Sequence, residues 1–222
     1  MGVISRLLGQ AGHPRGRVGR FMAREMNRKH AALRNWVLSG VPDCDGVGRI
    51  LDLGCGGGGT LRRLASLAPA AEIHGVDRSE DSIRVASRVN ADLIAVGRVF
   101  VRHASVSDLP YESGYFDVAL ATDSHYFWPD LPADLAEVRR VLRAGGRLLL
   151  GGAAYLGGRF NGLVRRFATA GGMNCQTLIE LEEALARAGY NDVTSRENWH
   201  RGWFCVVGTK PEGDQDEDSP AT

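Results

Sequence analysis

Apolar runs and glycine turns alternate along the middle of the chain. Three of the four residues before Gly54 are aliphatic, so 49–53 is expected to be a strand buried on both faces. A glycine-rich turn follows. The next segment has apolar residues at helical spacing and ends before Pro69: Leu61, Leu64, Ala65 and Ala68. A second strand is expected at 72–77, and this order predicts a parallel α/β unit.

The alternation continues beyond this unit. Ser79 is the expected N-cap of a helix, and further strands are expected at 98–102 and 115–121. A helix at 133–143 should be stopped by the glycine pair Gly145–Gly146 and followed by a fifth strand at 147–151.

The C-terminal part predicts a change of strand direction. A glycine-punctuated insertion at 153–175 holds a short apolar-faced segment, and a helix follows at 177–188. The strands expected at 192–197 and 203–208 are joined by only a few residues, which requires an antiparallel pair. The predicted fold is α/β: a Rossmann-like, seven-stranded, mostly parallel sheet with helices on both faces and an antiparallel C-terminal hairpin.

Both ends of the chain differ from this middle part. Residues 1–34 hold eight Arg or Lys against one acid, and apolar residues at mostly four-residue steps predict a helix: Val18, Met22, Met26, Leu33 and Val37. Residues 211–222 carry five acids and no apolar periodicity, so we expect disorder. We therefore divide the chain into a helical cap or lid (1–40), a main domain (41–210) and an acidic tail (211–222).

Composition narrows the class of protein. The 222 residues are 44% apolar, enough for one full core, and the net charge is only +1. The four cysteines lack C-x-x-C spacing, which argues against a disulfide framework and a zinc site. No apolar run approaches the ~20 residues of a membrane span, and a signal-peptide core is lacking, so a cytoplasmic location is the default.

The glycine turn has the pattern of a cofactor cradle. Residues 54–59 satisfy G-x-G-x-x-G, and Asp77 lies 21 residues past Gly56, where a ribose-binding acid belongs. Asp52 precedes the turn by two residues. Its charge would repel a pyrophosphate but attract the cationic amino group of a methionine moiety, which favours S-adenosylmethionine over a dinucleotide.

Five segments in order resemble motifs of class I S-adenosylmethionine-dependent methyltransferases: Ile-Leu-Asp-Leu-Gly-Cys-Gly-Gly-Gly, Gly-Val-Asp, Ser-Asp-Leu-Pro-Tyr, Tyr-Phe-Asp-Val and Val-Leu-Arg-Ala-Gly-Gly-Arg. The resemblance covers roughly residues 48–152. It implies that the cofactor is bound by Asp52, Gly54, Cys55, Gly56, Asp77, Arg78, Ser105, Val106 and Thr122. Ser105 stands where the family usually has an acid that contacts the adenine amine. The resemblance also suggests that Asn27, His30 and Trp36 belong to an N-terminal lid.

The residues after the fourth strand should face the transferred methyl group. His125 is the first candidate for a general base, Asp123 could hold an amine acceptor, and His200 on the last hairpin could contact the acceptor. A loop histidine without a catalytic task is the alternative for His125, and a turn-capping role is the alternative for Asp123. Tyr126, Phe127 and Trp128 could stack on an acceptor or pack beneath the next helix.

A small-molecule acceptor, methylated on oxygen or nitrogen, is the expected substrate. Sequence signatures of base amino-methylases and cytosine methylases are lacking, so a nucleic acid partner is not expected, and no carboxylate trio suggests a magnesium site. Two other functions remain open. One is an NAD(P)-dependent oxidoreductase on a similar sheet, and the other is a non-catalytic S-adenosylmethionine-binding module.

Overall fold

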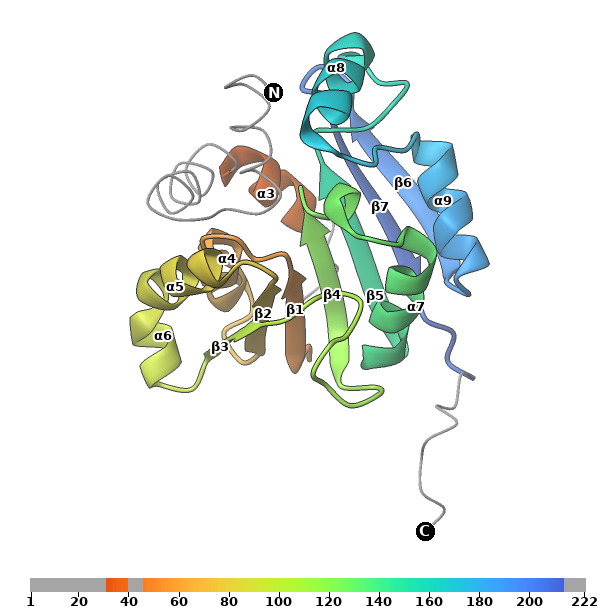
Figure 1. The fold of residues 1–222 in the computed structure, drawn as a ribbon. Coiled ribbons are helices and arrows are strands. Elements are labelled where there is room, and N and C mark those ends of the chain that lie inside the picture. Colours follow the sequence, from red (N-terminus) through yellow and green to blue (C-terminus); the bar gives the residue numbers. More distant parts are fainter. Residues whose placement is uncertain (1–30, 40–45, 214–222) are drawn as a thin grey trace.

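The computed structural model describes residues 31–39 and 46–213, which form one sheet with surrounding helices (Figure 1). The sheet has seven strands in the order β3-β2-β1-β4-β5-β7-β6. The strands are β1 Arg49–Leu53, β2 Glu72–Asp77, β3 Val99–His103, β4 Phe116–Thr122, β5 Leu142–Gly152, β6 Asn191–Asn198 and β7 Trp203–Thr209. The helices are α3 Ala31–Leu38, α4 Gly59–Leu67, α5 Glu80–Val89, α6 Ala91–Ala95, the short 3-10 helix η1 His125–Phe127, α7 Leu131–Val141, α8 Asn161–Gly171 and α9 Leu178–Arg187.

The strand directions confirm the predicted fold class. β1 pairs in parallel with β2 and β4, β2 with β3, and β4 with β5. β7 runs antiparallel to both β5 and β6, as the short link between the last two strands requires. The chain moves outward from β1 to β3 and then returns to β4, so the order reverses between β1 and β4. Ligands of open parallel sheets bind at the carboxyl ends of the strands beside such a reversal.

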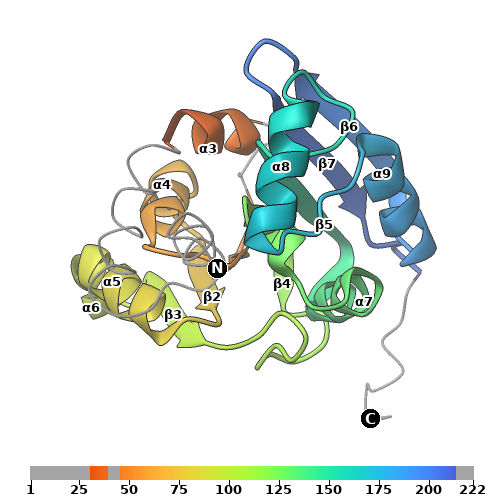
Figure 2. The ribbon, with the colours of Figure 1, turned by 45° about the horizontal axis from the view of Figure 1, so that its top comes forward.

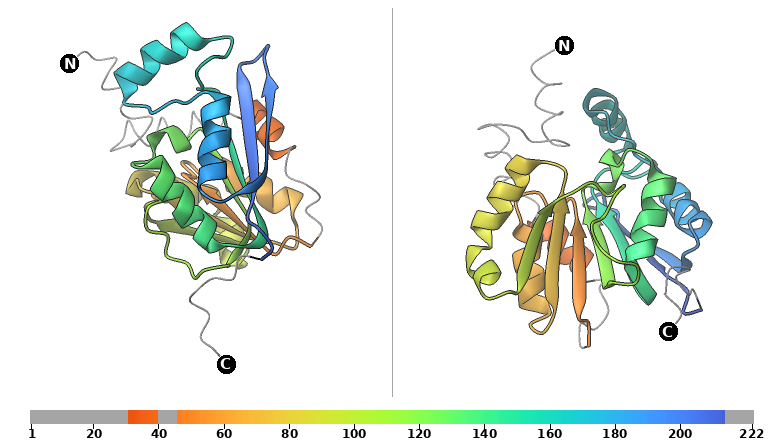
Figure 3. Two further views of the ribbon diagram at one scale, coloured as in Figure 1. Left: turned by 90° about the vertical axis from the view of Figure 1, so that its right-hand side faces the viewer. Right: turned by 60° about the horizontal axis from the view of Figure 1, so that its bottom comes forward.

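Successive side chains of the central strands pack on opposite faces of the sheet. Leu51 and Leu53 belong to the apolar cluster that α7 and α9 cover, whereas Ile50 belongs to the cluster beneath α3, α4 and α5. Figure 3 shows α7 and α9 on one side of the sheet and α3 and α4 on the other. Because both faces are covered, the strands lack the polar alternation of a half-exposed sheet.

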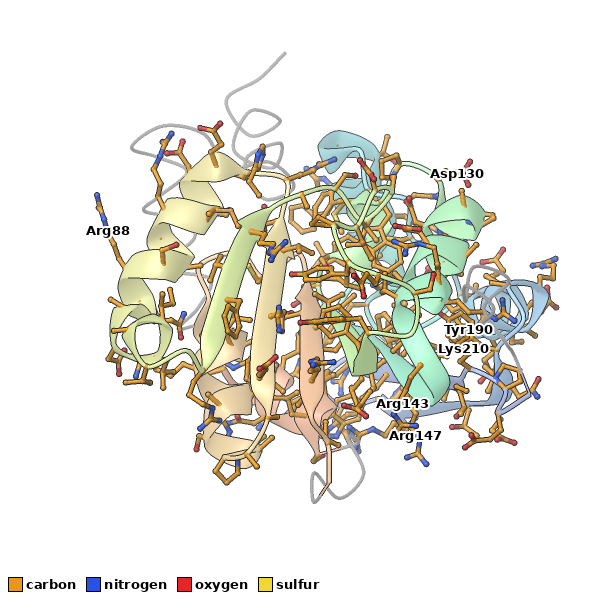
Figure 4. The ribbon with its side chains drawn as sticks, turned by 90° about the horizontal axis from the view of Figure 1, so that it is seen from below. Arg88, Asp130, Arg143, Arg147, Tyr190 and Lys210 are labelled. Atoms are coloured by element: carbon orange, nitrogen blue, oxygen red, sulfur yellow. The ribbon has the colours of Figure 1, made fainter. Side chains whose placement is uncertain are left out.

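The prediction is wrong at the junction of α7 and β5. The helix ends at Val141 and β5 begins at Leu142, so Gly145–Gly146 lies inside the strand and does not stop the helix. Gly145 has a φ of 70°, and its N–H donates to Lys210 O at 2.9 Å. The buried Lys210 ammonium in turn donates to Leu142 O at 2.9 Å at this lower end of the sheet (Figure 4). The two glycines therefore allow an irregular backbone within β5.

The other predicted elements agree closely with the structure. The strands at 49–53 and 72–77 have the expected bounds, and β3 and β4 each begin one residue later than expected. Ser79 caps α5 by accepting from the N–H of Ser82. The helices α6 and η1 were not expected.

Helix α3 is the described part of the predicted cap. It crosses β5 closely, because a Cβ at Gly151 would lie 2.6 Å from the Val37 side chain. Arg196 of β6 closes the end of α3 by donating to the carbonyls of Trp36 and Val37, and its guanidinium lies 4.3 Å from the centre of the Trp36 ring. The other predicted cap residues, including Asn27 and His30, and residues 214–222 lie outside the described part. Within that part, no helix is long and apolar enough to cross a membrane.

Candidate functional site

The turn after β1 is held by the end of β2. The N–H groups of Gly54 and Cys55 both donate to Val76 O, at 2.8 and 3.0 Å, and Gly58 N–H donates to Cys55 O at 2.9 Å. These bonds fix the turn at the carboxyl edge of the sheet, directly before α4. The helix N-terminus then faces this edge with amide groups that have no partner in the helix.

Two glycines of the turn are required for different reasons. Gly54 has a φ of 77°, and a Cβ there would lie 2.6 Å from Ser124 Cβ, because the loop after β4 packs directly on the turn. Ser124 Oγ donates to Leu53 O at 2.6 Å and holds that contact. Gly56 has a φ of 53°, but its Cβ would meet no described atom within 4 Å. Gly56 therefore faces open space that a ligand can enter.

Asp77 connects the glycine turn to the start of α5 through its two carboxylate oxygens. Its Oδ2 accepts from Gly56 N–H at 2.9 Å, and its Oδ1 accepts from Ser79 N–H at 2.8 Å. Each carboxylate oxygen can accept more than one hydrogen bond, so ribose hydroxyls can still bind here. The sequence predicted the ligand role, but the anchoring of the turn by Asp77 was not foreseen.

Asp52 is a buried carboxylate at the end of β1. The residue is 2% exposed, and its Oδ2 has no hydrogen-bond partner among the described residues. Burial, followed by the nearby charge of Asp77, raises the pKa of Asp52 to about 7, while Arg34 of α3 acts in the opposite direction. An unbonded buried carboxylate is costly unless a donor or a cation binds it. The site therefore favours a cationic group at this position.

The residues expected at the adenine lie beyond β2 and β3. Ala104 N–H donates to Asp77 O at 3.2 Å, which places the following Ser105 and Val106 at the same edge of the sheet. The Ser105 hydroxyl accepts from Ser107 N–H at 3.2 Å, and Val106 packs against the α7 side of the core. Arg78 lies nearby, with Nη1 3.5 Å from Phe127 O.

Asp123 ties the loop after β4 to the loop after β5. Its Oδ1 accepts from Tyr126 Oη at 3.0 Å and from Ala153 N–H at 2.9 Å. Its φ of 55° is strained for a residue other than glycine, so the surrounding bonds must hold it in place. A Cβ at Gly152 would lie 2.8 Å from the same oxygen. Thr122, just before Asp123, ends β4 with its hydroxyl buried and without a described partner.

His125 is buried among aromatic rings. It is 2% exposed, and its ring meets the rings of Tyr126 and Phe204 edge-on at centroid distances of 5.0 and 5.6 Å. Burial lowers the pKa of His125 to about 4, although the nearby Asp123 acts to raise it. The imidazole is therefore neutral near pH 7. Tyr126 and Trp128 are also buried, which agrees with packing beneath the next helix.

Acid should destabilise the protein through His125. The pKa of His125 is about 4 in the folded chain and ~6.5 when unfolded, so the unfolded chain binds the proton first as pH falls. The resulting loss of unfolding free energy should reach about 2 kcal/mol at pH 5. Urea unfolding of the parent and of His125→Phe at pH 7 and pH 5 measures it. An equal loss in both proteins would contradict this assignment.

His200 lies on the last hairpin. It is in the turn between β6 and β7, where its backbone oxygen accepts from Arg159 Nη1 at 3.3 Å. Phe204, which contacts His125, comes four residues later and pairs with Gly152 at the carboxyl end of β5. The structure brings Asp52, the glycine turn, Asp77, Thr122, Asp123 and His125 to this edge of the sheet, and His200 lies in the hairpin turn beyond the end of β5.

A metal centre would need a cluster of metal-ligating side chains, and the described part of the chain offers none. No group of three or more His, Cys, Asp or Glu residues there could hold a metal ion. Cys55, Cys175 and Cys205 are free thiols, and Cys44 lies outside the described residues.

Comparison with known proteins identifies the central segment. Residues 50–146 match a family described as a methyltransferase domain. By this match, the segment resembles a methyltransferase domain. The match contains the glycine turn, Asp77 and the strand order around the β1–β4 reversal.

Curated methyltransferases are similar to this segment over less than half of the chain. The chain is 36% identical over 104 residues to the nocamycin O-methyltransferase of Saccharothrix syringae, and 36% identical over 103 residues to the 27-O-demethylrifamycin SV methyltransferase of Amycolatopsis mediterranei. Each match covers 46% of this chain, and the chain spans only 37% and 38% of the two relatives. The apo structure of the S-adenosylmethionine-dependent methyltransferase SibL shares the fold: its TM-score is 0.71 at 22% identity, over 89% of this chain and 60% of that one.

The edge described above fits S-adenosylmethionine, the cofactor of this family. Gly56 leaves space where a side chain would block a ligand, and the unbonded Asp52 oxygen suits its amino group. Asp77 has acceptor capacity for the ribose hydroxyls. The Ser105 hydroxyl accepts from Ser107 N–H, and its second lone pair could accept from the adenine amine.

Cofactor affinity should fall with acid because of Asp52. A cationic amino group beside this carboxylate would lower its pKa from about 7, so binding must displace a proton at lower pH. We expect the affinity for S-adenosylhomocysteine to weaken about tenfold between pH 8 and pH 6. Isothermal titration calorimetry measures this, with Asp52→Asn as the control. A parent protein without this pH dependence would show that Asp52 does not hold the amino group.

Proposed function

We propose that this protein transfers the methyl group of S-adenosylmethionine to an oxygen or nitrogen atom of a small-molecule acceptor. The observation that carries the proposal is the buried Asp52 carboxylate, whose Oδ2 has no hydrogen-bond partner among the described residues, next to the Gly56–Asp77 pair. A dinucleotide would bring its pyrophosphate near this charge, whereas a methionine moiety brings an ammonium. The nocamycin and demethylrifamycin relatives, which are named for small-molecule acceptors, support the same class of substrate.

The residues at this edge would act mainly by alignment. The sulfonium of the cofactor supplies an activated methyl group, so proximity can contribute ~7–11 kcal/mol without covalent help from the protein. Asp52 would hold the amino group, Asp77 the ribose, and Ser105 and Val106 the adenine. Thr122 and Asp123, at the end of β4, would lie nearest the acceptor.

His125 would be a weak general base in this site. With a pKa of about 4 it is neutral at pH 7, but it gains little by accepting a proton. We therefore favour acceptors that are nucleophilic without such help, such as a carboxylate, an acidic phenol or a neutral amine. Asp123 is engaged by Tyr126 and Ala153, which favours positioning of this loop over direct contact with an amine.

Methyl transfer can be tested without knowing the acceptor. The full chain is incubated with S-adenosylmethionine labelled on the methyl group and with fractionated metabolite extracts. We expect label in a small-molecule fraction, and none when Asp52→Ala replaces the parent. Cofactor binding without transfer to any fraction would instead support a non-catalytic S-adenosylmethionine-binding module.

A further inference from the structure

Helix α8 and the β6–β7 turn expose large apolar side chains at one end of the molecule. On α8 and the residue before it, Phe160, Leu163 and Phe167 are 42, 53 and 39% exposed, and Trp199 in the turn is 51% exposed. The first three recur at helical spacing and form one stripe. Only Val164 is buried among the residues of α8. We call these exposed residues, with their basic neighbours, the α8 surface.

The two parts of the α8 surface are held together. Arg159 Nη1 donates to His200 O at 3.3 Å, and a Cβ at Gly202 would lie 2.5 Å from the Phe160 ring. Phe160 therefore rests directly on the hairpin turn. Figures 1 and 2 show α8 beside this turn, beyond the upper edge of the sheet. Helix α8 and the turn therefore expose their apolar side chains at the same end of the molecule.

The stretch that contains α8 carries basic but no acidic side chains. Residues 153–176 contain three arginines and no Asp or Glu, although the whole chain has a net charge of only +1. Arg165 and Arg166 are exposed on α8, and His200 and Arg201 follow Trp199 in the turn. By helical spacing, Arg166 lies beside the apolar stripe and Arg165 lies on the opposite face of α8.

We propose that the α8 surface docks the protein on an anionic lipid bilayer. An amphipathic helix with aromatic and leucine side chains on one face and arginines on its remaining surface suits the interface between headgroups and acyl chains. Tryptophan adds an apolar ring with a polar edge, which favours the same depth. A zwitterionic bilayer has no net negative charge to attract the arginines. This docking would bring the carboxyl edge of the sheet near the bilayer, and it does not depend on the proposed function.

Vesicle sedimentation tests the electrostatic part. The full-length protein is mixed, without cofactor or acceptor, with vesicles of phosphatidylcholine alone or with one third phosphatidylglycerol. We expect binding to the anionic vesicles only. Arg165→Ala with Arg166→Ala should weaken binding about 25-fold, from about fivefold for each basic residue near the surface. The control, Arg88→Ala with Arg187→Ala, removes the same charge from exposed positions on α5 and α9 and should have little effect (Figure 4 shows Arg88 pointing outward).

The apolar part is tested by charge insertion. Leu163→Asp with Phe167→Asp should reduce binding by at least about tenfold, because the stripe can no longer enter the headgroup layer. Val96→Asp, at a 70% exposed position on another surface, is the matched control. Melting temperatures show whether each variant is folded. If the parent ignores anionic vesicles, or the α8 variants bind as well as the parent, the proposal is wrong. Retained vesicle binding with impaired methyl transfer would instead assign the surface to the acceptor.

Discussion

Gly56→Val is expected to abolish binding of S-adenosylmethionine while leaving the sheet folded. The Cβ at this position meets no described atom, so the added side chain fits into the protein but enters the space proposed for the cofactor. The φ of 53° adds strain, which should cost about 1–2 kcal/mol of unfolding free energy. Calorimetric titration with S-adenosylhomocysteine measures the loss of affinity, and thermal unfolding measures the strain.

Gly97→Val separates strain from obstruction. Gly97 also has a positive φ, 70°, and its Cβ also meets nothing within 4 Å, but it lies in the turn before β3, away from the carboxyl edge. It should lose similar stability and keep full affinity. Equal affinities for the two variants would mean that the cofactor does not approach Gly56.

Asp77→Ala is expected to weaken cofactor binding by about 2–3 kcal/mol, because two hydrogen bonds from hydroxyl groups to a carboxylate are lost. The structure adds a second effect. The N–H groups of Gly56 and Ser79 lose their acceptor, so the turn should loosen and the melting temperature should fall. Calorimetry and thermal unfolding of the same preparation separate the two.

Asp117→Ala is the matched control for Asp77. The Asp117 carboxylate accepts from the N–H groups of Gly48 and Arg49, at 2.9 and 2.8 Å, at the opposite end of β1. Its removal should lower stability and leave cofactor affinity unchanged. If affinity falls equally in both variants, Asp77 acts only through the fold and does not bind the ribose.

The sequence was most informative where a backbone conformation is open mainly to glycine, or where a link between strands is too short for more than one topology. The glycine turn and the hairpin followed from backbone freedom and link length, and both are present. Gly145–Gly146 shows the limit of such reasoning. A glycine pair marks an irregular backbone, but whether the irregularity ends a helix or bends a strand depends on the neighbouring chain, here the Lys210 contact.

The properties of the site depended on packing that local sequence does not encode. The ordinary pKa of histidine suggested a general base at His125, but burial beside Tyr126 and Phe204 changes that value. In the same way, the Asp123 bonds to Tyr126 and Ala153 arise between loops that only the sheet brings together. The acidic residues at the ends of β1 and β2 were identified because strand ends can be located from the apolar pattern.

The central claim is that the carboxyl edge around Asp52, Gly56 and Asp77 binds S-adenosylmethionine rather than a dinucleotide. Calorimetric titration of the full chain with S-adenosylhomocysteine and, separately, with NAD tests it most directly. The account predicts saturable binding of S-adenosylhomocysteine at one site per chain and no detectable heat with NAD. Binding of NAD without binding of S-adenosylhomocysteine would contradict it and favour an oxidoreductase.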